Sequence, residues 1–178
     1  MKTALIVIDV QKEYQAGGAL AISGFDKAGT NILRLLAWAR TGNADILHVR
    51  HISTDLDDAD FRAGTPGIAF AAGFEPHENE SVFTKALPSA FSAPSFKATL
   101  KNKGYTQLIV CGFSSFLCCD STSREAFHRG YDVVFAEDAI GEFAFSGLTE
   151  EELHQYACAV QGVMFAKIMK TAEIIKLS

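Results

Sequence analysis

The chain has 178 residues, of which 48% are hydrophobic and 21% are charged, and its formal net charge at pH 7 is −5. This size and composition fit one globular domain over residues 1–178 with a substantial core. The net negative charge argues against a nucleic-acid-binding protein. No apolar run reaches the roughly 18 residues that a membrane span requires, so we expect no membrane association.

The four cysteines predict reduced thiols. Cys111, Cys118, Cys119 and Cys158 contain no CxxC pair and have no regular spacing, which is atypical of a disulfide framework or a zinc site. Strand-like sequence begins by Thr3, so we expect no secretory signal peptide. From both observations we expect a cytoplasmic location.

Strand-like and helix-like segments alternate along the chain. Residues 2–8 form an uninterrupted aliphatic run, as a strand buried on both faces requires. Residues 27–41 carry apolar side chains at helical spacing and end at Gly42. Further strands are expected at 44–52, 81–85, 107–111, 132–136 and 166–169, and further helices at 95–103, 117–129, 149–160 and from Thr171. This alternation predicts a three-layer α/β/α fold with a doubly wound parallel sheet of five to six strands.

Residues 53–80 do not fit this alternation. The segment holds four aspartates, then several glycines and prolines, and it is long for a loop in a compact domain. Two interpretations stay open: a functional lid, which could also contribute to an oligomer contact, or a disordered excursion. The aspartates are interpreted as a solvated loop face.

Two strands end in residues that suit catalysis. Asp9 follows the first strand, and Gly112 follows strand 107–111, just before Cys118 at the expected start of a helix. In a doubly wound sheet the ligand crevice lies at the carboxyl ends of the strands, where the strand order reverses. A thiol at a helix N-terminus has a lowered pKa and lies beside backbone N–H groups that can stabilise an oxyanion. If the two strands are neighbours, Asp9 and Cys118 face one crevice.

Seven short segments carry a recognisable pattern in chain order. They are residues 8–11 (IDVQ), 84–91 (TKALPSAF), 112–118 (GFSSFLC), 120–126 (DSTSREA), 130–133 (GYDV), 137–139 (EDA) and 171–174 (TAEI). Together they resemble the isochorismatase-like cysteine hydrolases, which include nicotinamidases, N-carbamoylsarcosine amidase and ureidoacrylate amidohydrolases.

The resemblance implies a catalytic triad. Asp9 would be the general base, Lys85 its electrostatic partner and Cys118 the nucleophile. A cis peptide bond between Phe113 and Ser114 would aim the amides of Ser114 and Cys118 as an oxyanion hole. The implied activity is hydrolysis of a C–N bond in a small amide, ureido or carbamoyl substrate through a cysteine thioester. We expect no cofactor, a small-molecule substrate and a homo-oligomer.

Five residues beside the motifs are candidates for a substrate pocket: Gln11, Tyr14, His51, Phe91 and Phe116. Ordinary core packing is the alternative for the aromatic residues, and a structural role is the alternative for His51. Phe116 stands where nicotinamidases carry a polar residue, which leaves the identity of the substrate open.

The sequence argues against a nicotinamidase-type metal site. Those enzymes have an aspartate and several histidines after the second strand, whereas this chain has no aspartate there before Asp55. His48 and His51 are three residues apart in a strand, so their side chains leave opposite faces. We therefore expect no metal.

Alternatives to the thiol mechanism are weaker. Cys119 aligns at helical spacing with core positions, and residues 112–116 lack the second glycine of a serine nucleophile elbow. An isochorismatase-type vinyl-ether hydrolase lacks the cysteine that this chain has. A catalytically idle binding or assembly subunit would not need the three residues of the triad.

Overall fold

The computed structural model describes residues 2–55 and 57–177. In this part of the chain, six parallel strands form one sheet in the order β3-β2-β1-β4-β5-β6. The strands are β1 (Thr3–Ile8), β2 (Asp45–His51), β3 (Ser81–Lys85), β4 (Gln107–Phe113), β5 (Asp132–Gly141) and β6 (Lys167–Met169). The predicted parallel sheet is confirmed, and β5 continues five residues beyond its expected end.

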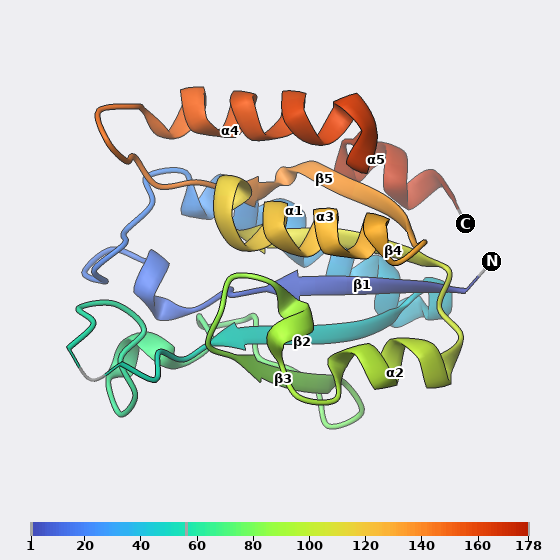
Figure 1. Ribbon diagram of the computed structural model, residues 1–178, viewed down its shortest axis with the longest axis horizontal. Helices are drawn as coiled ribbons and strands as arrows, with labels where there is room; N and C mark the ends of the chain where they lie inside the picture. Colours follow the sequence, from blue (N-terminus) through green and yellow to red (C-terminus); the bar gives the residue numbers. More distant parts are fainter. Residues whose placement is uncertain (1, 56, 178) are drawn as a thin grey trace.

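Helices cover both faces of the sheet (Figure 1). They are α1 (Phe25–Trp38), α2 (Phe96–Lys103), α3 (Asp120–His128), α4 (Glu150–Val160) and α5 (Thr171–Ile174). Helices α1 and α5 share one core with Leu5 and Val7 of β1, whereas α2 and α3 share the other with Ile6 and Ile8. The aliphatic run of β1 is thus buried on both faces, as its composition predicts, and the three-layer fold is confirmed.

The strand order reverses between β1 and β4. The chain begins with β1 at the centre, continues outward to β2 and β3, and then returns to β4 on the other side of β1. Ile8 pairs with Gly112 in this register. Gly112 has a φ of +119°, and a Cβ there would lie 1.9 Å from the carbonyl oxygen of Ile8, so the position requires glycine. The residues after β1 and after β4 are therefore neighbours.

The segment between β2 and β3 docks on the residues that follow β1. The backbone N–H of Lys12 donates to the carbonyl of Ala69 at 2.9 Å, and the N–H of Ala71 donates to the carbonyl of Val10 at 3.0 Å. Phe61, in the same segment, is buried. Of the two interpretations, a disordered excursion is wrong for the described residues 53–55 and 57–80, which form an ordered cover beside the crevice.

Within the described residues, no helix combines the length and the apolar composition needed to cross a bilayer.

Candidate active site

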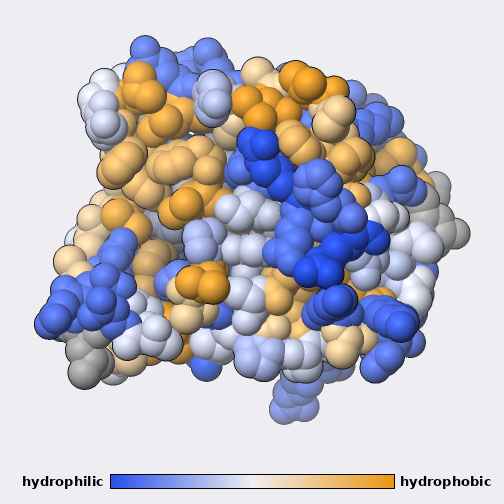
Figure 2. Space-filling view, in the orientation of Figure 1, coloured by the Kyte–Doolittle hydropathy of each residue, from blue (hydrophilic) through white to orange (hydrophobic). Residues whose placement is uncertain are grey.

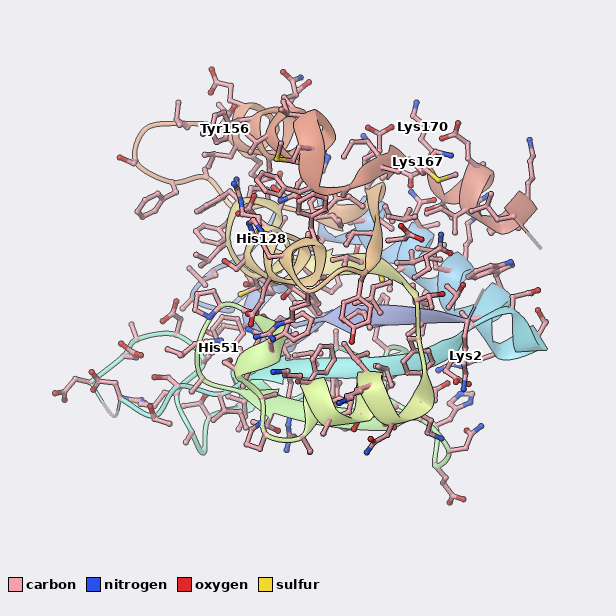
Figure 3. All side chains as sticks on the ribbon, turned by 45° about the vertical axis from the view of Figure 1, so that its right-hand side comes forward. Lys2, His51, His128, Tyr156, Lys167 and Lys170 are labelled. Atoms are coloured by element: carbon pink, nitrogen blue, oxygen red, sulfur yellow. The ribbon has the colours of Figure 1, made fainter. Side chains whose placement is uncertain are left out.

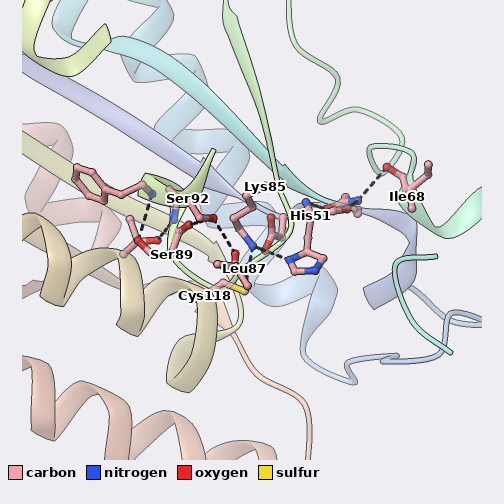
Figure 4. A network of polar contacts seen from close by, with 12 residues as sticks. His51, Ile68, Lys85, Leu87, Ser89, Ser92 and Cys118 are labelled. Carbon is pink, nitrogen blue, oxygen red and sulfur yellow. Dashed lines mark hydrogen bonds and ion pairs between the residues drawn. The ribbon is translucent and has the colours of Figure 1, made fainter. Parts of the chain in front are cut away.

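Asp9, Lys85 and Cys118 converge at the carboxyl edge of the sheet. Asp9 directly follows β1, Lys85 is the last residue of β3, and Cys118 lies in a short π-helical turn, Ser115–Cys119, after β4. The Lys85 Nζ lies 2.7 Å from the Oδ2 of Asp9 and 3.3 Å from the Sγ of Cys118 (Figure 4). All three side chains are buried. The arrangement agrees with the switch-point argument from the sequence.

His51 is the third partner of the Lys85 ammonium. Its Nδ1 lies 3.0 Å from the Nζ of Lys85, so the three ammonium hydrogens face Asp9, Cys118 and His51. A neutral imidazole that accepts at Nδ1 carries its proton on Nε2. His51 ends β2, and Figure 3 shows it at the end of the sheet opposite Lys2. Of the pocket candidates, His51 is the one in contact with the triad.

Burial determines the protonation state of the thiol. Burial and the neighbouring Asp9 raise the pKa of Cys118 to about 12, although Lys85 acts in the opposite direction. The resting cysteine is therefore a thiol, and the lowered thiol pKa expected from the sequence is wrong. Its helix begins at Ser115, but the desolvation of a side chain with 4% exposure outweighs the favourable helix dipole.

The charges of the other groups follow from the same contacts. Burial alone would lower the pKa of Lys85, but Asp9 and Cys118 raise it, so the ammonium stays protonated. Burial and the charge of Lys85 lower the pKa of His51, against the opposing effect of Asp9. Both carboxylate oxygens of Asp9 are buried, and a hydrogen bond between Asp9 and the Cys118 side chain contributes to the raised pKa of the thiol. The site thus holds an ion pair, a neutral imidazole and a thiol.

The turn before Cys118 has the backbone that the family resemblance implied. The peptide bond between Phe113 and Ser114 is cis. The N–H of Cys119 donates to the carbonyl of Ser114 at 3.0 Å, which closes the π-helical turn. The Phe113 ring stacks on Phe25 with a centroid distance of 5.0 Å, so this side chain supports the turn from below.

Gln11 connects β2 with the covering segment. Its Nε2 donates to the carbonyls of His51 and Ile68, both at 2.9 Å, and its Oε1 accepts from the N–H of His51 at 2.7 Å. Both hydrogens of the Gln11 amide nitrogen and its amide oxygen are thus hydrogen-bonded to backbone groups. Gln11 holds His51 in place beside Lys85.

Two aromatic candidates are part of packed clusters. Tyr14 is 1% exposed and its ring contacts Phe61 and Phe113. Phe91 contacts Phe96 edge-on at 5.2 Å, on the α2 side of the sheet. For both residues the structure shows the core packing that was the alternative to a pocket role.

Phe116 lies closer to the surface. Its ring contacts Phe143 at 5.3 Å and Phe145 at 6.1 Å, both from the loop between β5 and α4. Phe145 is 58% exposed and Leu148 is 48% exposed. Figure 2 shows apolar residues gathered over this loop. An apolar surface therefore adjoins the turn that carries the thiol.

Two residues near the site were missed from the sequence. Phe61 packs on the His51 ring at 5.0 Å, and Glu142 hydrogen-bonds to the turn that precedes Cys118. Neither belongs to a quoted motif. The one available signal for Glu142 was its place a few residues after the EDA segment, toward the carboxyl end of a strand.

The donor set resembles a metal site but is organised around a lysine. Ligand atoms of Asp9, His51 and Cys118 all lie within 4.8 Å of one another. Nζ of Lys85, however, lies 2.7 to 3.3 Å from an atom of each. The ammonium therefore takes the central position that a metal ion would need, and the residues do not fit a metal while Lys85 stays there.

Comparison with known proteins decides the family. The isochorismatase domain profile matches residues 3–173, nearly the whole chain. The chain belongs to the isochorismatase family. A solved structure of an isochorismatase from Pseudomonas putida KT2440 has 38% sequence identity to this family member and a TM-score of 0.86, covering 96% of this chain and 89% of that one.

Two sequence relatives extend the comparison. YddQ, an isochorismatase family protein of Bacillus subtilis strain 168, is 31% identical over 99% of this chain and 100% of its own length. The ureidoacrylate amidohydrolase RutB of Variovorax paradoxus S110 is 27% identical over 85% of this chain and 73% of its own length. The family thus includes a hydrolase named for cleaving a C–N bond.

Proposed function

We propose that this isochorismatase-family protein is a cysteine hydrolase that cleaves a C–N bond of a small amide, ureido or carbamoyl substrate. The observation that carries the proposal is the contact of one ammonium, on Lys85, with both a carboxylate and a thiol, on Asp9 and Cys118. The amidohydrolase relative RutB supports the choice of bond.

In the first half-reaction, Sγ of Cys118 attacks the substrate carbonyl carbon while Asp9 takes the thiol proton. A thiol with a pKa of about 12 needs such a base at the moment of attack. The carbonyl π electrons move to oxygen, and the amides of Ser114 and Cys118 donate to the resulting oxyanion. When the oxyanion collapses, the C–N bond breaks and Asp9 returns the proton to the leaving nitrogen.

In the second half-reaction, water hydrolyses the thioester. Asp9 accepts a proton from water, hydroxide attacks the acyl carbon, and the C–S bond breaks with protonation of sulfur by Asp9. The products are ammonia or an amine and a carboxylic acid or carbamate. Lys85 keeps its proton throughout and stabilises the negative charge as it moves between Asp9 and sulfur.

The test is a screen of small amides, ureas and carbamates for release of ammonia or amine. Cys118→Ala should lose turnover, and mass spectrometry should detect an acyl group on the peptide that contains Cys118. Cys119→Ala is the matched control, because its thiol is fully buried beside the nucleophile and should be dispensable. Turnover that survives in Cys118→Ala would overturn the mechanism, and cleavage of a vinyl ether but no amide would overturn the substrate class.

A further inference from the structure

Glu142 is a buried carboxylate that the mechanism above leaves unused. It follows β5, whose Gly141 pairs with Phe113 of β4, so the sheet brings it beside the turn that leads to Cys118. Its residue exposure is 3%. No ion pair within residues 2–55 and 57–177 neutralises it. Burial raises the pKa of this carboxyl above its ordinary value, and its hydrogen bonds to Ser115 and to the backbone act in the opposite direction.

The hydrogen bonds of Glu142 go to the first residues of the turn. Its Oε2 accepts from the hydroxyl of Ser115 at 2.6 Å and from the backbone N–H of Phe116 at 2.9 Å. Its Oε1 accepts from the N–H of Phe143 at 2.8 Å. One carboxylate oxygen therefore holds two consecutive residues between the cis peptide bond and Cys118.

We propose that Glu142 is a positioning residue that fixes the turn 114–118, so that the Ser114 and Cys118 amides keep the orientation needed to bind the oxyanion. The inference rests on the proposed function for its catalytic consequence. Its structural part, that the acceptor oxygen of Glu142 orders the turn, stands independently. Glu142 itself touches neither the thiol nor the substrate in this assignment.

The electrostatic effect of Glu142 is separable from its hydrogen bonds. Its negative charge contributes to raising the pKa of Cys119, the neighbour of the nucleophile, and that of Tyr14. Both substitutions compared below remove this charge, so a difference in turnover between them does not come from its electrostatic effect. A loss of turnover after removal of the acceptor would therefore come from the geometry of the turn.

The experiment compares two neutral substitutions of similar size. In Glu142→Gln the amide oxygen can still accept from Ser115 and Phe116, whereas Glu142→Met has no such acceptor. We expect kcat of Glu142→Met to fall by about 10- to 100-fold with KM within about twofold, because oxyanion contacts act mainly in the transition state. Glu142→Gln should stay within about threefold of the wild type, since it retains both contacts to the turn.

Two further measurements keep the inference independent of activity and folding. Amide hydrogen exchange of Phe116 should accelerate in Glu142→Met and stay slow in Glu142→Gln. If Glu142→Met does not fold, Ser115→Ala replaces it in the comparison. Ser115→Ala removes one of the two hydrogen-bond donors to Oε2 of Glu142 and should give a smaller loss of kcat. Equal loss of turnover in Glu142→Gln and Glu142→Met, or unchanged exchange in both, would overturn the positioning role. Turnover that persists in Cys118→Ala would instead overturn the proposed function.

Discussion

Two clusters of charged groups lie at the amino and carboxyl edges of the sheet, and they differ in burial, because Arg40 at the amino edge is exposed whereas Asp9 and Lys85 at the carboxyl edge are buried. At the amino edge, Glu80 precedes β3 and contacts Arg40 through both carboxylate oxygens, at 2.8 and 3.1 Å. It also contacts Nε2 of His48 at 2.8 Å and accepts from the N–H of His77 at 3.0 Å. At the carboxyl edge, one buried lysine serves three acceptors, on Asp9, His51 and Cys118.

The difference separates a stabilising cluster from a reactive one. Burial alone would raise the pKa of Glu80, but the contacts with Arg40, His77 and His48 lower it to about 2, so this carboxylate does not take up a proton near neutral pH. The carboxyl edge combines a fully buried carboxylate, on Asp9, with a thiol that has kept its proton. The amino edge also borders an open cavity of about 310 Å³. Neither this cavity nor a larger one of about 570 Å³ beside the covering segment is lined by Asp9, Lys85 or Cys118, so cavity size does not indicate where these groups lie.

Neutralising one carboxylate in each cluster should give the largest contrast. We expect Asp9→Asn to lower kcat by at least about 10³-fold, because the group that accepts and returns the proton is lost. Glu80→Gln should leave kcat unchanged, since Glu80 lies at the other edge of the sheet. Steady-state kinetics with circular dichroism as a check on folding measures both. Comparable losses of kcat in the two variants would remove the distinction between the clusters.

Acid unfolding should depend on the amino-edge cluster. The folded pKa of Glu80 lies below its ordinary value of 4.5, at about 2. The resulting stabilisation is present above pH 4.5 and is lost as the pH falls toward 2. Between about pH 5 and pH 2, the free energy of unfolding of the wild type should fall by about 2 kcal/mol more than that of Glu80→Gln. Urea unfolding at several pH values measures this, and parallel pH profiles would contradict it.

His51 should shape the acid limb of activity. Burial and the charge of Lys85 lower the pKa of His51, against the opposing charges of Asp9, Asp60 and Asp58. The imidazole is therefore neutral at pH 7 and takes up a proton only at pH values below its ordinary pKa of 6.5. A protonated His51 cannot accept from Lys85, so kcat/KM should decline at acidic pH, below the ordinary histidine pKa of 6.5.

Two substitutions test separately whether His51 acts through its hydrogen bond to Lys85 or through its change of charge with pH. His51→Leu should lose about 10-fold in kcat at all pH values, because a hydrogen bond to a charged group is lost. His51→Asn offers a carbonyl oxygen that does not titrate, and its acid limb should flatten. Retention of the wild-type profile in His51→Asn would show that another group controls this limb.

The alkylation rate of Cys118 should depend on Asp9 as a base, because the resting cysteine is a thiol and not a thiolate. Cys158 is more exposed than Cys118, and burial raises its pKa only to about 11, so it competes for iodoacetamide in the free protein. These pKa values therefore give Cys118 no larger thiolate fraction than Cys158 in the resting protein. We expect Asp9→Asn to slow alkylation of Cys118 by several-fold and to leave Cys158 unchanged. Peptide mapping measures both rates, and equal slowing at the two sites would contradict the role of Asp9.

Much of the fold followed from local pattern. The aliphatic run 2–8 predicted a strand buried on both faces, and its alternation with helical segments predicted the layers. Because parallel strands place their carboxyl ends at one edge, the position of Asp9 after β1 and of Cys118 after β4 indicated a shared crevice. Lys85 came from the family resemblance, since a lysine at the end of a strand is by itself ordinary.

Only the tertiary structure decided the protonation state of the site and the partners of its groups. The pKa of Cys118 depends on how deeply the thiol is buried and on its distance to Asp9, and neither is visible in a helix-start pattern. Glu142 and His51 act through partners 26 and 34 residues away in the chain. Local sequence specifies where the strands end, because backbone pattern is set by neighbours in the chain. Desolvation and long-range hydrogen bonds depend on how the described strands and helices pack together, which is why the chemistry at those ends required the folded structure.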